Sequence, residues 1–416
     1  MAPSPRTGYV IGAVAVAGLL LPPPITALLI VAVLAGAVVD AASVRRVPEL
    51  VRRVAPVLAR GVESRLVCEA VEPGRGRMRI RQPVPWDLAL TPSESDDRLD
   101  ASLVPRRRGR HTLPAMAVRR DGPLGLGRWY HRAGEAAEVL VYPDLPAARR
   151  LALAVRQGRF RDPGRMTRGP LGLGTDFESI RDYNSDDDIR QVNWRATARL
   201  GRPMSNQYRI EQDRDIVCVV DCGRLMGAPL AGSLTRLDAA IDATAAVALV
   251  ADEVGDRCGA VAFDAAVRRS VSPRRSGGDA VVRAVFDLEP ISVDSDYELA
   301  FRTMGGAKRA MVLVFTDLLE EAAARPLIEA VPLLARRHAV VIATAADPDF
   351  ERLVSTPPER VSDVYRAAAA LDVLDAQERV AGRLRRAGAD VIEAPPARLG
   401  AACIGAYLRA KSLARL

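Results

Sequence analysis

The chain has 416 residues, of which 49% are hydrophobic and 26% are charged, so it is long enough for two or three domains and too apolar to be disordered. The net charge is +8, but Lys308 and Lys411 are the only lysines and aromatic residues make up just 4%. Arginines interspersed with acids, without aromatic side chains for base stacking, argue against a nucleic-acid-binding protein. Five scattered cysteines and three histidines predict neither a disulfide framework nor a zinc site.

The first segment, residues 1–42, contains two uncharged apolar runs, Tyr9–Leu21 and Ile25–Val39, separated by Pro22-Pro23-Pro24. Three prolines break a continuous helix, and each run is shorter than the roughly 20 residues that span a bilayer comfortably. The pattern favours a transmembrane helical hairpin over a cleaved signal peptide, because a second apolar run follows the first. Arginines flank the hairpin on both sides. The positive-inside rule therefore predicts an inner-membrane protein whose soluble parts face the cytoplasm.

The second segment, residues 43–150, consists of short runs separated by Pro and Gly. Strand-length runs such as Arg65–Val71, Arg77–Arg81 and Glu138–Tyr142 have turn residues between them. This pattern predicts a small antiparallel β-sandwich.

The third segment, residues 151–210, is dense in charge of both signs. Ser185 is a helix-capping residue type, and Ile189, Val192, Ala196 and Leu200 recur at helical spacing before Gly201. We therefore expect a helix from about Ser185 to Leu200. Trp194 and Ile189 are expected to anchor this helix in the fold through their apolar side chains.

The last segment, residues 211–416, alternates strands and helices, which predicts a Rossmann-like α/β domain with a mostly parallel sheet. The predicted helix is Leu234–Val254. The predicted strands are Ile216–Val220, Gly259–Phe263, an edge strand Val267–Val271, Met311–Thr316, Ala339–Ala345 and Asp390–Glu393. Asp221 and Asp317 each follow a strand, at the sheet edge where such folds bind ligands.

The run from Gly172 to Arg199 resembles the signature of the bacterial domain-of-unknown-function family 58. The matching residues are Gly172, Gly174, Phe177, Arg181, Tyr183, Asp187, Asp188, Arg190, Trp194 and Ala196–Arg199. The sequence departs from the signature at Asp186, where glycine is usual, and at Asn193, where aspartate is common. The resemblance implies a carboxyl-terminal half similar to a von Willebrand factor type A domain, and association with MoxR-type AAA+ ATPases. The residues expected to serve interaction or structure are Arg181, Tyr183, Asp187, Asp188, Arg190, Trp194, Arg195, Arg199 and Arg224.

Type A domains often bind Mg²⁺ through an Asp-x-Ser-x-Ser loop, a Thr and a further Asp, because hard cations want several oxygen ligands. Here the first loop is Asp221-Cys222-Gly223-Arg224-Leu225, which lacks both hydroxyls. Asp221, Ser295 and Asp317 would form only a degenerate magnesium site. We therefore expect no cofactor, and we expect Arg224 to supply the positive charge between the two carboxylates.

These features predict a non-enzymatic, membrane-anchored interaction or assembly protein that works with a MoxR-type ATPase. A membrane sensor or structural protein without an ATPase partner is the alternative. A metal-dependent hydrolase would require Asp221 and Asp317 to meet a third carboxylate, such as Asp264 or Asp296.

Overall fold

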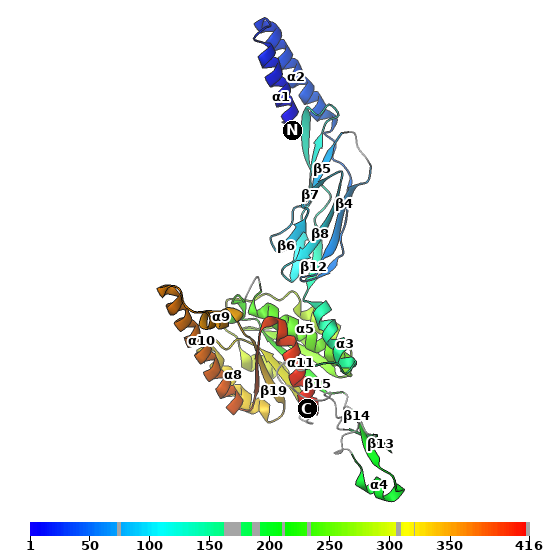
Figure 1. Ribbon diagram of the computed structural model, residues 1–416, viewed down its shortest axis with the longest axis vertical. Helices are drawn as coiled ribbons and strands as arrows, with labels where there is room; N and C mark the ends of the chain where they lie inside the picture. Colours follow the sequence, from blue (N-terminus) through cyan, green and yellow to red (C-terminus); the bar gives the residue numbers. More distant parts are fainter. Residues whose placement is uncertain are drawn as a thin grey trace. The chain divides into compact units, whose positions relative to one another are not determined.

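The computed structural model describes residues 1–72, 76–161, 176–184, 192–209, 213–230, 234–304, 309–319 and 321–412. The chain divides into two compact units, Met1–Tyr142 and Pro143–Leu416 (Figure 1). This division is coarser than the four segments expected from the sequence, and those finer boundaries stay a prediction.

Two apolar helices begin the first unit. Helix α1 covers Pro5–Ala17 and helix α2 covers Pro23–Ser43, and the two lie side by side (Figure 1). Each begins with proline at its first position, where the missing N–H removes no helical hydrogen bond. Among the helices of the described ranges, α2 alone is long and apolar enough to cross a membrane.

The rest of the first unit is built of short strands, most of them paired antiparallel, as the sequence predicts. The sheet orders are β1-β11-β10-β5-β7, β2-β4-β8-β6 and β3-β12-β9. Buried side chains of all three sheets, including Ile80, Leu103 and Val139, form one core. In β8 the buried positions alternate with more accessible ones, as expected for a strand with one face on a core. The strands are β1 (Ala2–Pro3), β2 (Leu50–Arg53), β3 (Val57–Ala59), β4 (Ser64–Ala70), β5 (Met78–Arg81), β6 (Leu88–Thr91), β7 (Glu94–Asp96), β8 (Arg98–Pro105), β9 (Gly109–Leu113), β10 (Met116–Asp121), β11 (Gly127–Ala133) and β12 (Ala137–Tyr142).

The second unit contains a six-stranded sheet of order β17-β16-β15-β18-β19-β20. The edge strand β17 pairs antiparallel with β16, and the other pairs are parallel. With its strands numbered in chain order within the sheet, this order is 3-2-1-4-5-6, which is the order of doubly wound α/β sheets. The strands are β15 (Asp215–Asp221), β16 (Arg257–Phe263), β17 (Val267–Arg274), β18 (Ala310–Phe315), β19 (Ala339–Ala345) and β20 (Asp390–Ala394). The mixed α/β prediction is thus confirmed.

Helices cover both faces of this sheet. On β15, Ile216, Cys218 and Val220 pack into a core with α3, α5, α6 and α11, and Val217 and Val219 pack into a second core with α7, α8 and α10. The helices are α3 (Leu145–Arg156), α5 (Arg236–Val254), α6 (Gly278–Val285), α7 (Tyr297–Thr303), α8 (Glu321–Ala335), α9 (Pro348–Ser355), α10 (Val361–Arg386) and α11 (Pro396–Ser412). The cores on both faces fix the carboxyl ends of β15 and β18 next to each other.

The described residues of the charged third segment beyond α3 form a β-ribbon with one short helix. Strands β13 (Asp176–Asp182) and β14 (Met204–Arg209) pair antiparallel, and helix α4 covers only Trp194–Leu200 (Figure 1). The expected helical position of Val192 is wrong, because Val192 forms a β-bridge with Ser205. Residues 185–191, and with them the expected cap Ser185, lie outside the described residues.

The start of α4 has a local cause. The Asn193 side chain accepts a hydrogen bond from the Ala196 amide at 2.9 Å, which satisfies a free amide at the helix start. Gly201 ends the helix in a left-handed conformation, as the sequence predicts.

Candidate functional site

The two strand-end aspartates lie near each other, because β15 and β18 are adjacent and parallel. Asp221 is the last residue of β15, and Asp317 follows β18 by two residues. Both are buried, and the charge of Asp221 is one of the influences that raise the pKa of Asp317.

Hydroxyl and amide groups surround the Asp221 carboxylate. Its Oδ1 accepts from the Gly223 amide at 2.8 Å and from the hydroxyl of Ser295. Its Oδ2 accepts from the Thr316 hydroxyl at 2.7 Å, with the Tyr297 hydroxyl at 3.1 Å. Burial raises the pKa of Tyr297 well above its usual value, so the phenol keeps its proton. Both oxygens of the Asp221 carboxyl group thus accept hydrogen bonds from neutral donors.

Arg236, from the first turn of α5, supplies the positive charge of the site. Its Nε lies 3.0 Å from Oδ2 of Asp317, and both side chains are buried. Its Nη1 also donates to the Ala345 carbonyl at 2.9 Å. Burial raises the pKa of Asp317 to about 6, and the Arg236 guanidinium acts against that rise.

The expectation that Arg224 would fill this place is wrong. Arg224 lies on a 3₁₀ turn, Arg224–Gly227, and its Nε donates to Asp294 at 2.7 Å in an exposed pair. Sequence reasoning missed Arg236, Tyr297 and Thr316. A Thr-Asp pair directly after an apolar strand was the signal for Thr316, and the capping box of Thr235 with Asp238, which fixes the start of α5, was the signal for Arg236.

The residues at this edge do not fit a magnesium ion. The oxygens of Asp221 already accept from protein donors, and Asp317 is paired with Arg236. A Cβ on Gly223 would overlap the hydroxyl of Ser295, so Ser295 occupies the space of the missing first-loop serine. In the described ranges no three His, Cys, Asp or Glu residues are grouped to hold a metal. Mg²⁺ prefers several free oxygen ligands in near-octahedral geometry, whereas here Asp221 is hydrogen-bonded and Asp317 is ion-paired within the protein.

The additional carboxylates that a hydrolase would need have other partners. Asp264 accepts from the Ala266 amide at 2.9 Å and lies 3.6 Å from Arg268. Asp296 caps α7 by accepting from the Leu299 amide at 2.9 Å.

A small cavity of about 240 Å³ adjoins Asp221 at this edge. The Arg224–Asp294 pair lies on its rim, and α8 contributes Ala322, Ala323 and Pro326. Its size and mixed lining suit one inserted side chain.

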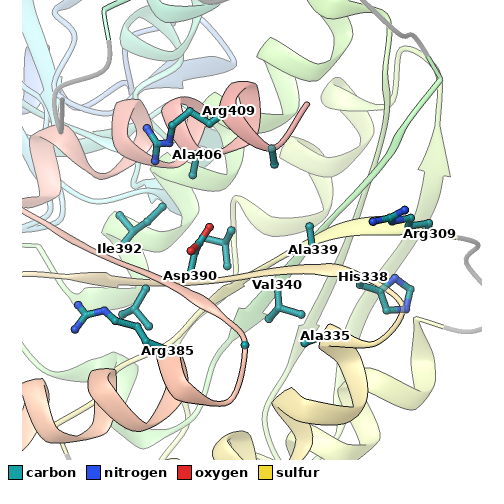
Figure 2. Close-up of a pocket in the computed structure, with 14 residues that line it drawn as sticks. Arg309, Ala335, His338, Ala339, Val340, Arg385, Asp390, Ile392, Ala406 and Arg409 are labelled. Carbon is teal, nitrogen blue, oxygen red and sulfur yellow. The ribbon is translucent and has the colours of Figure 1, made fainter. Parts of the chain in front are cut away.

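A larger cavity of about 730 Å³ lies at the opposite edge, where β18, β19 and β20 begin. Figure 2 shows Asp390 near Arg385 and Arg409, with Arg309 and His338 at the other end. In this cavity Arg385 pairs with Glu378 at 2.7 Å, and His338 Nδ1 accepts from the Ala310 amide. Doubly wound sheets bind ligands at the carboxyl edge, so the site is assigned to the Asp221 edge.

The ribbon β13–α4–β14 carries the described residues of the signature. The Trp194 side chain is 69% exposed, so the expectation that it anchors a core is wrong. Arg195 and Arg199 on α4 are exposed as well. Arg181 donates to the Asp182 carbonyl at 3.0 Å, and the Tyr183 amide donates to the Pro203 carbonyl. Asp187, Asp188 and Arg190 lie outside the described residues.

Comparison with known proteins supports the resemblance seen in the signature. Residues 179–390 match the family described as "Protein of unknown function DUF58". The chain belongs to this family. Uncharacterized proteins of Mycobacterium bovis (Mb1516) and Mycobacterium tuberculosis (Rv1480) are 28% identical over 220 residues, which is 50% of this chain and 66% of theirs. The match thus spans just under two thirds of these relatives.

Among solved structures, a cohesin module from a Clostridium perfringens family 33 glycoside hydrolase aligns with 23% of this DUF58 protein and 98% of its own chain. The identity is 9% and the TM-score is 0.17, so we infer neither fold nor function from this likeness.

Proposed function

We propose that this DUF58 protein is a non-enzymatic interaction or assembly protein, anchored in the inner membrane and working with a MoxR-type AAA+ ATPase in the cytoplasm. Helices α1 and α2 are the anchor, with both ends on the cytoplasmic side. The six-stranded sheet is the von Willebrand factor type A-like part. The sheet order and the aspartates at the carboxyl edge support that assignment.

The exposed face of α4 is the observation that carries this proposal. Trp194 is 69% exposed beside the exposed Arg195 and Arg199, although a large ring normally lies against a core. Trp and Arg are the residue types that dominate the binding energy of protein interfaces. The Asp221 carboxylate, by contrast, is closed in by the hydroxyl donors of Ser295, Tyr297 and Thr316. This favours binding over catalysis.

A binding experiment with a matched control tests the proposal. The full-length protein, reconstituted in nanodiscs, is titrated with a purified MoxR-type ATPase from the same organism. We expect Trp194→Ala to weaken binding by about 2 kcal/mol, the usual size of an interface hot spot. Trp86→Ala is the control, because Trp86 is also 69% exposed but lies in the first unit. The proposal fails if the parent chain does not bind the ATPase, or if both variants weaken binding equally. Failure to bind would favour a membrane sensor or structural protein.

A further inference from the structure

We propose that α1 and α2 form a monotopic anchor, which enters the bilayer from the side of the first unit's strands and turns inside the hydrocarbon without crossing it. This inference rests on the membrane attachment proposed above. It concerns the depth that the helix pair reaches.

The start of α1 is fixed to the β-strands of the first unit. Strand β1 pairs with β11, with Ala2 opposite Arg128. The Ser4 hydroxyl donates to the Gly125 carbonyl at 2.5 Å, and the Thr7 hydroxyl donates to the Leu126 carbonyl. Ser4 and Thr7 are buried, so the first turn of α1 belongs to the β structure and not to a membrane.

The end of α2 is fixed to the same place. The buried Asp40 carboxylate accepts from the amides of Leu124 at 2.9 Å, Leu126 at 2.8 Å and Gly127 at 2.9 Å. A Cβ on Gly127 would overlap the Ala37 carbonyl, so glycine is what lets β11 approach the helix this closely. From Ala37 onward, one side of α2 is therefore covered by protein.

The free part of the pair is too short to cross a bilayer. Beyond its first turn, helix α1 has ten residues, Gly8–Ala17, a rise of about 15 Å. The free part of α2, from Pro23 to residue 36, rises about 20 Å. A typical hydrocarbon core is roughly 30 Å thick, so the tip passes the midplane and stops short of the far interface.

The tip has the chemistry of a segment surrounded by lipid. Leu20 is 92% exposed, and no charged residue lies between Arg6 and Asp40. The amides of Leu19 and Leu20 donate to carbonyls of α1, and after Leu21 come Pro22, Pro23 and Pro24, which have no N–H to satisfy. Unsatisfied backbone donors are costly in hydrocarbon. A turn that emerged in water would not need three consecutive leucines.

Cysteine accessibility tests the depth of the tip. All five native cysteines are buried, so the maleimide is expected to label mainly the introduced thiol. Leu20→Cys reports on the tip, and Leu333→Cys, exposed on α8, is a matched control in the second unit. Each full-length variant is treated with a membrane-impermeant maleimide in sealed inside-out and right-side-out vesicles. We expect complete loss of Leu20→Cys labelling in both preparations until detergent is added, with Leu333→Cys labelled in inside-out vesicles.

The possible outcomes separate the inference from the function. Labelling of Leu20→Cys in right-side-out vesicles alone would show that the tip crosses, which overturns the inference and leaves the anchor intact. Labelling on the same side as Leu333→Cys, with release of the protein by carbonate, would overturn the membrane attachment itself. If Leu20→Cys is protected, a fluorophore attached there should be quenched most by lipids with a nitroxide deep in the acyl chain. Absence of such quenching would mean that protein covers the tip, and the inference fails.

Discussion

At the scale of single residues, Arg236 and Asp317 set the electrostatics of the strand-end site. Their side chains form an ion pair that is almost wholly shielded from water. Pairs of this kind contribute little net stability compared with apolar residues, but removal of one partner leaves an uncompensated buried charge. The second aspartate, Asp221, adds negative charge nearby and is held by neutral donors.

Arg236→Met should therefore lower the free energy of unfolding by roughly 3–5 kcal/mol at pH 7. The loss should shrink as the pH falls from 7 towards the folded-state pKa of Asp317, about 6, and should therefore be smaller at pH 5. The folded-state pKa of Asp317 is already raised from 3.8 to about 6, and loss of Arg236 raises it further. A raised pKa means that the carboxyl favours folding when protonated, and this contribution disappears as the pH rises through the folded-state pKa. Urea denaturation at pH 5 and pH 7 measures the difference.

Arg224→Met is the control for that experiment, because the exposed Arg224–Asp294 pair should contribute at most about 1 kcal/mol. Equal losses for Arg236→Met at both pH values would contradict the role given to Asp317.

Millimolar Mg²⁺ should leave the melting temperature of the protein unchanged relative to EDTA. The Asp221 oxygens already accept from Ser295, Gly223 and Thr316, and an ion that cannot bind the folded state cannot stabilise it. Differential scanning fluorimetry is sufficient to measure this, with Ca²⁺ as a second hard cation. A clear Mg²⁺-dependent rise in the melting temperature would show that the donors rearrange around a metal.

At the scale of elements, hydrogen bonds between described residues join the start and middle of α4 to β14. Asn193 Nδ2 donates to Asn206 at 2.7 Å, and the Met204 amide donates to Thr197 Oγ1 at 3.0 Å. The exposed Trp194 and Leu200 take no part in these contacts. Helix α4 is therefore held in place although its largest side chain, that of Trp194, is exposed.

Trp194→Ala should change the free energy of unfolding by no more than about 0.5 kcal/mol, as is usual for exposed positions. Chemical denaturation of the full-length protein in detergent tests this. A loss of several kcal/mol would mean that the ring is buried after all, as the sequence pattern had suggested.

Asp40 connects α2 to the turn between β10 and β11. Asp40→Ala leaves three amides without their acceptor, which should cost roughly 3 kcal/mol or more. Asp100→Ala is a matched control in the same unit, since Asp100 pairs with Arg65 at the surface and should matter little. Thermal unfolding of the reconstituted protein would separate the two variants. Comparable stability of both would contradict a clamping role for Asp40.

At the scale of the whole molecule, the strands and the position of the aspartates could be predicted, whereas the partners of the aspartates could not. Apolar runs that end in Asp identified β15 and the loop after β18. Such runs, and the polar residues that end them, can be read from neighbouring positions in the sequence. Arg224 lies three residues from Asp221, but Arg236 is the residue that reaches the site, because the start of α5 packs against the strand ends. The capping box in the sequence marks where α5 begins, but a single sequence does not show which strand ends that helix start will pack against.

The third segment shows a different limit. The spacing of Val192, Ala196 and Leu200 predicted a longer helix, but the backbone around Val192 pairs with β14. In so short a stretch the residues can form either a helix or a β-ribbon. The Asn193 side chain caps the helix, so the helix begins after Asn193. Because the helix begins only at Trp194, it is a short helix, and the Trp194 ring is exposed.

The two compact units suggest an experiment on the whole chain. The fragment Pro143–Leu416, expressed alone, should fold and unfold in a single cooperative transition, because both cores that flank its sheet come from its own residues. Circular dichroism with urea titration would show this. A fragment that lacks a cooperative transition would mean that the first unit is needed for folding.

In the membrane attachment proposed above, the clamp at Asp40 would also limit how the first unit can turn relative to the lipid surface. With three amides bound to one carboxylate and β1 paired with β11, the β structure cannot swivel about a loose tether. A body held in this way diffuses in two dimensions and keeps only rotation about the bilayer normal. Part of the rotational entropy that association normally costs has then been lost before any partner arrives. Two proteins anchored in this way in the same membrane would thus meet with their tilt relative to the bilayer already fixed.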